Sequence, residues 1–410
     1  MVTMNDRDRP ATRLVLDRTG PGHVVLNVEQ PELLVVGASR LPAPTRGGWA
    51  PPSPRPLYPG QPALSVQATA NVDNAAVVAS VAVAGGIGAV YSTQMKMRGR
   101  KKRVKDLLAR HADVGGDATT VVFDASCYAG KNRDVGAREL DREWIRFQLA
   151  QDLPYAYTDS PYLPAGDRPA LLSVLTQTVK MKLPVVAVLA LALDWLKKSR
   201  ERQYLIDQVN RAGVPIAVVL EHEKDPLGIQ AAVVGLVDVL AQVDVAVILL
   251  RSDVSAIGAV ALGAAMGAVG TRSGQRHLFP RKPGRGGSRG EHISLFVPYA
   301  MSYRRLDTLA AAMAKAPDEQ SWFTCDCPEC AGRNLAYVDT HERAYSHSIS
   351  ALGVLAGHVL QDPTVAPTAW LSRCTHAQHV NLELESRLRS GWPVPDFLGA
   401  WQVALPAPNR

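Results

Sequence analysis

Short apolar segments recur along this 410-residue chain, and their spacing constrains its fold more than any other feature. They follow one another at roughly 30 residues, the usual length of a βα unit. Two of them, residues 185–189 and 245–249, are apolar throughout, as expected of parallel strands buried on both faces. Eight such segments can be identified: Leu64–Ala70, Gly88–Tyr91, Thr120–Asp124, Pro154–Asp159, Pro184–Leu191, Val214–Glu221, Val243–Leu250 and Ala265–Thr271.

The stretches between these segments carry helical signals. Residues 199–211 have a helical pattern that ends before Gly213, and residues 229–242 form a second predicted helix. Eight alternating units predict an α/β protein, a (β/α)8 TIM barrel over residues 63–320. An open, doubly wound sheet is the structural alternative.

Different compositions flank the predicted barrel. Residues 1–40 predict a small N-terminal β unit, because short strand-like segments surround the turn Gly20-Pro21-Gly22. Residues 41–62 contain eight prolines, which predicts a Pro-rich connector without a helix or central strand. Residues 321–410 are expected to form a zinc-binding subdomain with C-terminal helices.

Composition and charge narrow the class of protein. A hydrophobic content of 47% supports a large core, and residues 1–10 are charged, without the apolar segment of a secretory signal. No membrane-spanning segment is visible, so we expect a cytoplasmic protein with no membrane partner. The net charge of +7 favours a polyanionic partner. Solvated loops without a partner are the alternative interpretation of the two basic runs that contribute to this charge. The first run consists of Arg98, Arg100, Lys101, Lys102, Arg103 and Lys105, and the second of Arg276, Arg281, Lys282, Arg285 and Arg289.

Three of the five cysteines fall within six positions, as Cys325-x-Cys327-x-x-Cys330. Thiolates this close suit one tetrahedral ion better than disulfide bonds, so we expect zinc. The fourth ligand is expected to be His347, at the start of a predicted helix over residues 348–360. The alternatives are His341, His358 and, more remotely, Cys374. Four protein ligands would make the zinc site structural.

Charged residues stand where the predicted strands end. Asp124, Asp159 and Glu221 end the third, fourth and sixth apolar segments, Asp253 follows the seventh and Arg272 follows the eighth. In a TIM barrel the catalytic groups gather at this edge, although a strand-end carboxylate can also be a helix cap.

Three segments, together with the cysteine motif, carry a family resemblance. Residues 123–128 (Phe-Asp-Ala-Ser-Cys-Tyr) resemble an Asp-Ser-Gly-Gly-aromatic motif, residues 153–160 resemble the strand that follows it, and residues 270–277 resemble a Pro-Thr-Arg-x-x-Arg-His motif. Over residues 60–360 the chain resembles the tRNA-guanine transglycosylase family, enzymes that exchange guanine for a 7-deazaguanine in a polynucleotide. The family is a (β/α)8 barrel with a Cys-x-Cys-x-x-Cys…His zinc subdomain.

The resemblance implies roles for the matching residues. Asp124 and Asp159 would bind the polar edge of the purine, and Tyr128 would stack on its face. Arg272, Arg276 and His277 would contact the nucleic-acid backbone, with Lys101, Lys102 and Arg103 as a second contact zone.

The chain departs from the family at the nucleophile. The strand before Thr271-Arg272 reads Met266-Gly267-Ala268-Val269, without the family's aspartate. The Gly-rich ends of the family's fifth and sixth strands are also replaced, by residues 189–192 and 218–221. This divergence fits the DNA-modifying branch of the family better than the tRNA enzymes. Asp253 is the first choice as nucleophile, followed by Asp124 and then Glu221, and Arg251 is expected to pair with Asp253 or to form a plain structural salt bridge.

The predicted function is therefore exchange of guanine for a free 7-deazaguanine base, in DNA or, alternatively, in tRNA. Two rival functions remain: a non-catalytic accessory subunit of such an enzyme, and an unrelated barrel enzyme with a small substrate. Whether the chain acts alone, as a homodimer or with a partner subunit is left open.

Overall fold

The computed structural model describes residues 55–70, 72–93, 97–281, 293–388 and 391–405. Residues 49–410 belong to one compact unit. The predicted N-terminal β unit, most of the connector and three residues of the second basic run (Lys282, Arg285 and Arg289) lie outside the described residues.

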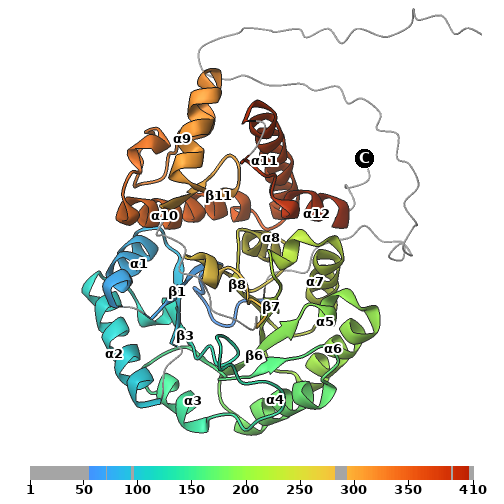
Figure 1. Cartoon of the computed structure of the whole chain (residues 1–410). Coiled ribbons are helices and arrows are strands. Elements are labelled where there is room, and N and C mark those ends of the chain that lie inside the picture. The colour runs from blue at the N-terminus through green and yellow to red at the C-terminus, as the bar shows by residue number, and fades with distance from the viewer. Residues whose placement is uncertain (1–54, 71, 94–96, 282–292, 389–390, 406–410) are drawn as a thin grey trace, which may run out of the picture. The chain divides into compact units, whose positions relative to one another are not determined.

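Every one of the eight predicted segments contains a strand of one curled parallel sheet (Figure 1). The strands are β1 (Leu64–Thr69), β2 (Gly88–Ser92), β3 (Val121–Asp124), β4 (Ala156–Tyr157), β6 (Val185–Ala192), β7 (Ile216–Glu221), β8 (Val247–Ser252) and β9 (Met266–Gly270), with a short β5 (Tyr162–Leu163) beside β6. The order β3-β2-β1-β9-β8-β7-β6-β4 pairs the first strand with the last. The sheet is therefore compatible with a TIM-like fold, in which β3 and β4 are the two ends of the described ladder.

Helices surround the outside of the curled sheet in Figure 1. They are α1 (Val72–Ala84), α2 (Met97–Asp113), α3 (Arg142–Leu149), α4 (Arg168–Met181), α5 (Asp194–Lys197), α6 (Ser199–Ala212), α7 (Gln230–Gln242) and α8 (Ser255–Ala261). Three 3-10 turns, η1 (Ala118–Thr120), η2 (Pro226–Gly228) and η3 (Ser273–Gln275), lie in the connections. Gly213 ends α6 in the left-handed conformation, at φ 64°, which glycine adopts without a steric penalty.

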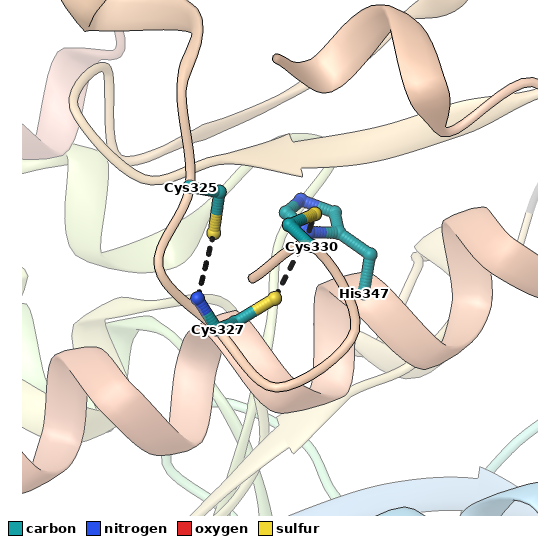
Figure 2. Close-up of side chains that lie close together, drawn as sticks. All are labelled: Cys325, Cys327, Cys330 and His347. Atoms are coloured by element: carbon teal, nitrogen blue, oxygen red, sulfur yellow. Dashed lines mark hydrogen bonds between the residues drawn. The ribbon is translucent and has the colours of Figure 1, made fainter. Parts of the chain in front are cut away.

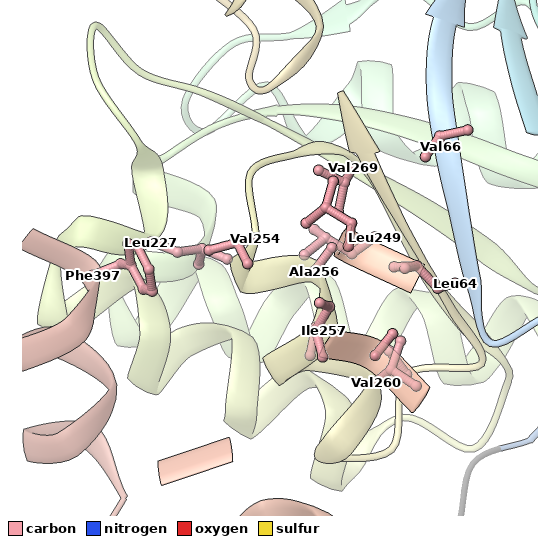
Figure 3. Packing of buried hydrophobic residues seen from close by; sticks show 14 of the residues in the cluster. Leu64, Val66, Leu227, Leu249, Val254, Ala256, Ile257, Val260, Val269 and Phe397 are labelled. Carbon is pink, nitrogen blue, oxygen red and sulfur yellow. The ribbon is translucent and has the colours of Figure 1, made fainter. Parts of the chain in front are cut away.

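Successive side chains of a strand point to opposite faces of the curled sheet and form two apolar clusters, one inside the sheet and one outside it. On β6, Val186 and Val188 belong to the inner cluster, whereas Ala187 and Leu189 belong to the outer one. Tyr155 and Tyr157 add bulk to the inner cluster, so side chains fill the interior of the curled sheet. Figure 3 shows the outer cluster between β1, β8 and β9 and helix α8.

The C-terminal region adds a hairpin and further helices to the same unit. The hairpin consists of β10 (Ser294–Val297) and β11 (Ser302–Arg305). The helical elements are α9 (Leu306–Lys315), η4 (Pro317–Phe323), η5 (Leu335–Tyr337), α10 (His341–Leu360), α11 (Ala366–Leu388) and α12 (Asp396–Ala404). At Gly258 of α8 a Cβ atom would come within 2.4 Å of the Trp370 ring of α11, so a glycine is required for this close packing.

Two expectations can be compared directly with the helices. The alternative interpretation of the first basic run placed it in a solvated loop, and this was wrong: residues 98–105 lie within α2. None of the helices in the described part of the chain is long and apolar enough to cross a membrane.

Candidate metal centre and candidate active site

The three clustered cysteines lie on one tight turn between η4 and η5. The Cys330 and Ala331 amides donate to the Cys327 carbonyl at 3.0 and 2.8 Å, and the Gly332 amide donates to the Cys325 carbonyl at 3.0 Å. Ala331 and Gly332 both have positive φ, so the chain reverses immediately after the third cysteine. The turn brings the three thiols together.

His347, in the second turn of α10, completes the group (Figure 2). Its Nδ1 lies 3.5 Å from Cys327 Sγ and 3.2 Å from Cys330 Sγ. Its Nε2 lies 2.7 Å from the Phe296 carbonyl of β10, and a proton on Nε2 leaves Nδ1 free as a ligand. The four ligand atoms all lie within 4.8 Å of one another, and all four residues are buried.

These distances fit a metal ion. Zinc-to-sulfur and zinc-to-nitrogen bonds at a tetrahedral angle place the two ligand atoms about 3.5 Å apart, close to the separations observed here. Hydrogen bonds from Cys325 and Cys330 lower the pKa of the Cys327 thiol, which favours the thiolate that binds metal. The other predicted ligands lie elsewhere: His341 and His358 are exposed on α10, and Cys374 is buried in α11.

A second polar cluster lies inside the carboxyl edge of the sheet, around Asp124. Its carboxylate accepts hydrogen bonds from the Tyr128 hydroxyl at 2.6 Å and the Ser126 amide at 2.7 Å. Gln67 Nε2 at 3.2 Å and Ser92 Oγ at 3.3 Å lie against the same carboxylate. Burial raises the pKa of Asp124, although the Tyr128 hydroxyl and the nearby Arg251 charge oppose this shift.

Arg251 lies beside this cluster in a strained conformation. A bulge between Leu249 and Ser252 disturbs the pairing of β8 with β9, and Arg251 has φ 47° within it. Such a conformation costs a non-glycine residue about 1–3 kcal/mol and is most common at functional sites. The guanidinium is buried and donates to Ser126 Oγ at 3.0 Å and to the Gly274 carbonyl at 2.5 Å. It does not form the expected pair with Asp253.

The structure thus brings Asp124 and Tyr128 together, and both are fully enclosed. Tyr128 is 1% exposed, so its ring offers no open face for stacking in this conformation. Asp159 lies in a separate ion pair, in which Arg138 Nη2 is 2.5 Å from its carboxylate. The same carboxylate accepts a hydrogen bond from the Asp141 amide at 2.9 Å.

The other strand-end carboxylates have different surroundings. Asp253 is half-buried, and its carboxylate accepts the Val254 amide at 2.8 Å. Glu221 is engaged by the Arg133 guanidinium and the Tyr162 hydroxyl, with Arg133 stacked 3.8 Å from the Tyr162 ring centre. Of the three candidate nucleophiles, Asp253 therefore has the carboxylate least engaged by other side chains.

The predicted phosphate contacts are spread along the same edge. Arg272 is exposed, and the Arg276 guanidinium lies 3.1 Å from the centre of the Tyr303 ring of β11. Burial lowers the pKa of His277 to about 4, so His277 is uncharged at neutral pH and adds no positive charge. On α2, the exposed Lys102 pairs with Asp106 of the same helix, and Lys101 pairs with Glu143 of α3.

Sequence reasoning missed four members of the buried cluster, namely Gln67, Ser92, Ser126 and Gln275, and it paired Arg251 with Asp253 instead of with this cluster. One signal was available. Ser65 and Gln67 are polar residues in a strand of a sheet that is expected to be buried on both faces, and a buried amide requires partners.

Comparison with known proteins gives little further guidance. No protein-family model matches the chain, and no curated protein matches it. A solved tryptophan synthase from M. tuberculosis is similar over 52% of this chain and 83% of its own, at 16% identity and a TM-score of 0.28. A likeness at this TM-score supports no argument about function.

Proposed function

We propose that the chain is a guanine transglycosylase that exchanges guanine for a 7-deazaguanine base in a polynucleotide, with DNA as the first candidate substrate and tRNA as the alternative. The observation that carries this proposal is the buried cluster of Asp124, Gln67 and Arg251 at the carboxyl edge of a TIM-like sheet. Catalytic groups in such folds gather at this edge. The proposal includes closure of the sheet between β3 and β4 as a complete (β/α)8 barrel.

The proposed reaction needs a carboxylate near the sugar and polar groups around the base. The Asp253 carboxylate attacks C1′ of the flipped-out nucleotide, and the bond from C1′ to guanine N9 breaks as guanine leaves with a proton taken from water. The resulting glycosyl ester is attacked by N9 of the incoming base, which loses its own N9 proton and frees the carboxylate. Asp124 accepts hydrogen bonds from the purine, and Arg272 and Arg276 contact the phosphates.

Zinc fits the Cys325, Cys327, Cys330 and His347 cluster as a structural ion. Three thiolates and one imidazole fill all four tetrahedral positions, which leaves none for substrate. The ion would fix the turn of cysteines against α10 and β10. It takes no part in the proposed exchange.

The test is a base-exchange assay with purified protein. Duplex DNA and tRNA are each incubated with a free 7-deazaguanine base, and their nucleosides are then measured by mass spectrometry. We expect the modified nucleoside in DNA, with one guanine released for each base incorporated. Product in tRNA alone would support the alternative substrate. Absence of product in both polymers would contradict the proposal for the isolated chain.

Variants assign the nucleophile. Asp253→Asn is expected to lower the exchange rate by about 10³-fold or more, as loss of a nucleophile commonly does. Asp244→Asn is the matched control, because Asp244 is an exposed aspartate before the other end of β8. If Asp253→Asn retains full activity, Asp253 is not the nucleophile, and a covalent protein–polynucleotide adduct that still forms in Asp253→Asn but not in Asp124→Asn would assign that role to Asp124.

One observation favours a second function, that of a non-catalytic subunit. Ala268 of β9 stands where the resembling family has its nucleophile, and it belongs to the inner apolar cluster. An accessory subunit would bind polynucleotide yet give no product alone. It would raise the exchange rate of an active transglycosylase added to the same assay.

A further inference from the structure

The Arg251 guanidinium is a buried cation without a carboxylate partner in the described part of the chain. Its Nη atoms donate to Ser126 Oγ and to the Gly274 carbonyl, which are both neutral acceptors. Its Nε is buried and has no hydrogen-bond partner among the described residues. A buried charged donor that lacks an acceptor is unfavourable, so the site is incomplete without one.

Arg251 and Asp124 are held beside each other by two shared neighbours. Gln67 accepts the Arg251 amide at 2.6 Å through Oε1, while its Nε2 lies 3.2 Å from Asp124 Oδ2. Ser126 accepts from the Arg251 guanidinium at 3.0 Å, and its amide donates to Asp124 Oδ1 at 2.7 Å. One charged donor and one charged acceptor are therefore fixed in one polar cluster.

The backbone at both ends of this arrangement is strained. Arg251 has φ 47° and Ser126 has φ 53°, and neither is a glycine. The Arg251 amide donates to Gln67 and the Ser126 amide donates to Asp124, and these two hydrogen bonds maintain the two conformations. Strain that the surroundings hold in place keeps the side chains preorganised for a ligand.

We propose that Arg251 and Asp124 together bind the lactam edge of a 6-oxopurine, which makes Arg251 a specificity-determining residue. This inference rests on the proposed function and extends it. Arg251 Nε donates to the O6 carbonyl, and Asp124 accepts from the neighbouring N1–H and N2–H groups after the Tyr128 and Ser92 hydroxyls, which donate to Asp124 Oδ2 in the free protein, turn away. A 6-aminopurine presents a donor at position 6 and an unprotonated N1, so both contacts are lost.

The turn η3 lies against the cluster that contains Arg251 and Asp124, and it must move when the base binds. The Gly274 carbonyl accepts from Arg251, and Gln275 Oε1 accepts from Ser92 Oγ at 3.2 Å. Two hydrogen bonds therefore join the turn to the cluster. The ligand carbonyl supplies a new acceptor to the same guanidinium when the turn moves.

The test is equilibrium dialysis of the full chain with radiolabelled guanine, without polynucleotide. Unlabelled guanine and 2,6-diaminopurine, which differ only in the 6-oxo group and the N1 proton, compete for the site. We expect wild-type protein to prefer guanine by about tenfold or more, the effect of hydrogen bonds that involve charged groups. Arg251→Gln is expected to reduce this preference to about twofold or less.

Two further variants keep the result interpretable. Arg202→Gln is the matched control, because Arg202 pairs with Asp238 in the helical layer, and it is expected to retain the preference. Arg251→Lys keeps the charge but lacks the Nε donor. It is expected to lose the preference for guanine, and it replaces Arg251→Gln in the test if that variant does not fold.

The inference is overturned if wild-type protein shows no preference, or if the folded Arg251 variants keep it. Its failure is distinguishable from failure of the proposed function. If the protein exchanges bases but shows no Arg251-dependent preference for guanine, only the inference about Arg251 is wrong. If it prefers guanine but exchanges no base in either polymer, only the proposed transglycosylase activity is wrong.

Discussion

The buried carboxylate of Asp225 makes the stability of the folded state depend on pH. Its Oδ1 accepts the Leu227 amide at 2.9 Å at the start of η2, but its Oδ2 is buried without a partner among the described residues. Burial, followed by the neighbouring charge of Asp253, raises the pKa of Asp225 from 3.8 to about 7. The folded state therefore holds this proton more tightly than the unfolded state.

The sign of the pH effect follows from that shift. Between pH 4 and 7 the unfolded chain loses the Asp225 proton first, so stability falls as the pH rises and stays lower above pH 7. We expect Asp225→Asn to remove this penalty and keep the amide acceptor for Leu227. In urea unfolding the variant should match wild type near pH 4 and exceed it by on the order of 2 kcal/mol at pH 8.

Asp117 provides a control with the opposite sign. It also caps a 3-10 turn, η1, and the Thr119 amide lowers the pKa of its carboxyl. Asp117→Asn should therefore lose stability at pH 8 and little at pH 3. If both variants respond to pH alike, the explanation given for Asp225 is wrong.

Helix α2 places the first basic run near the proposed active site. It begins at Met97, shortly after β2 ends at Ser92, so its first turns lie towards the carboxyl edge of the sheet. Val104 and Leu107 are buried, while Lys102 is exposed. Lys102 and Lys105 thus lie on the outer surface of an amphipathic helix, whereas Arg100 is buried.

We expect this helix to contact the phosphates of bound DNA. Lys102→Gln combined with Arg103→Gln should weaken DNA binding and lower the slope of log affinity against log salt by up to about two, close to one for each lost phosphate contact. Lys180→Gln combined with Lys182→Gln removes the same charge at the end of α4, before β6 begins, and should leave the slope unchanged. Equal slopes for both pairs would exclude α2 from the interface.

The elements differ in how well their sequences predict them. The strands were predicted because segments such as residues 185–189 are apolar on both faces, and burial on both faces is a local signal. Helix α2 was missed because six basic residues obscured the spacing of Val104 and Leu107. Helix α10 starts at His341, with Thr340 as its cap, rather than at Ser348, because the polar first turns hid its beginning.

The same reasoning applies to the two clusters. Three metal-ligand candidates lie within six residues, so sequence spacing alone indicated the metal centre. The contact between Gln67 and Arg251 joins residues 184 positions apart. Only the curled sheet, which pairs β1 with β9 next to β8, brings them together, and no local pattern contains that information.

Across the whole unit, the metal centre and the sheet share one apolar core. The cluster containing Cys325, Cys327 and Cys330 also contains Leu64 of β1 and Ile257 of α8. His347 connects the turn of cysteines to α10 and, through the Phe296 carbonyl, to β10. Helix α10 in turn contacts α1 and α8. Loss of the ion should therefore affect the entire unit.

We expect one zinc ion per chain and a single cooperative thermal transition for residues 49–410. His347→Ala should lose the ion, which mass spectrometry of the metal content measures. The midpoint in calorimetry should fall by on the order of 10 °C, because several kcal/mol of binding energy also stabilise the fold. His358→Ala, which removes an exposed histidine of the same helix, should retain both the ion and the midpoint. Two separate transitions in the His347 variant would show that the C-terminal region unfolds independently of the sheet, in contradiction to the shared core.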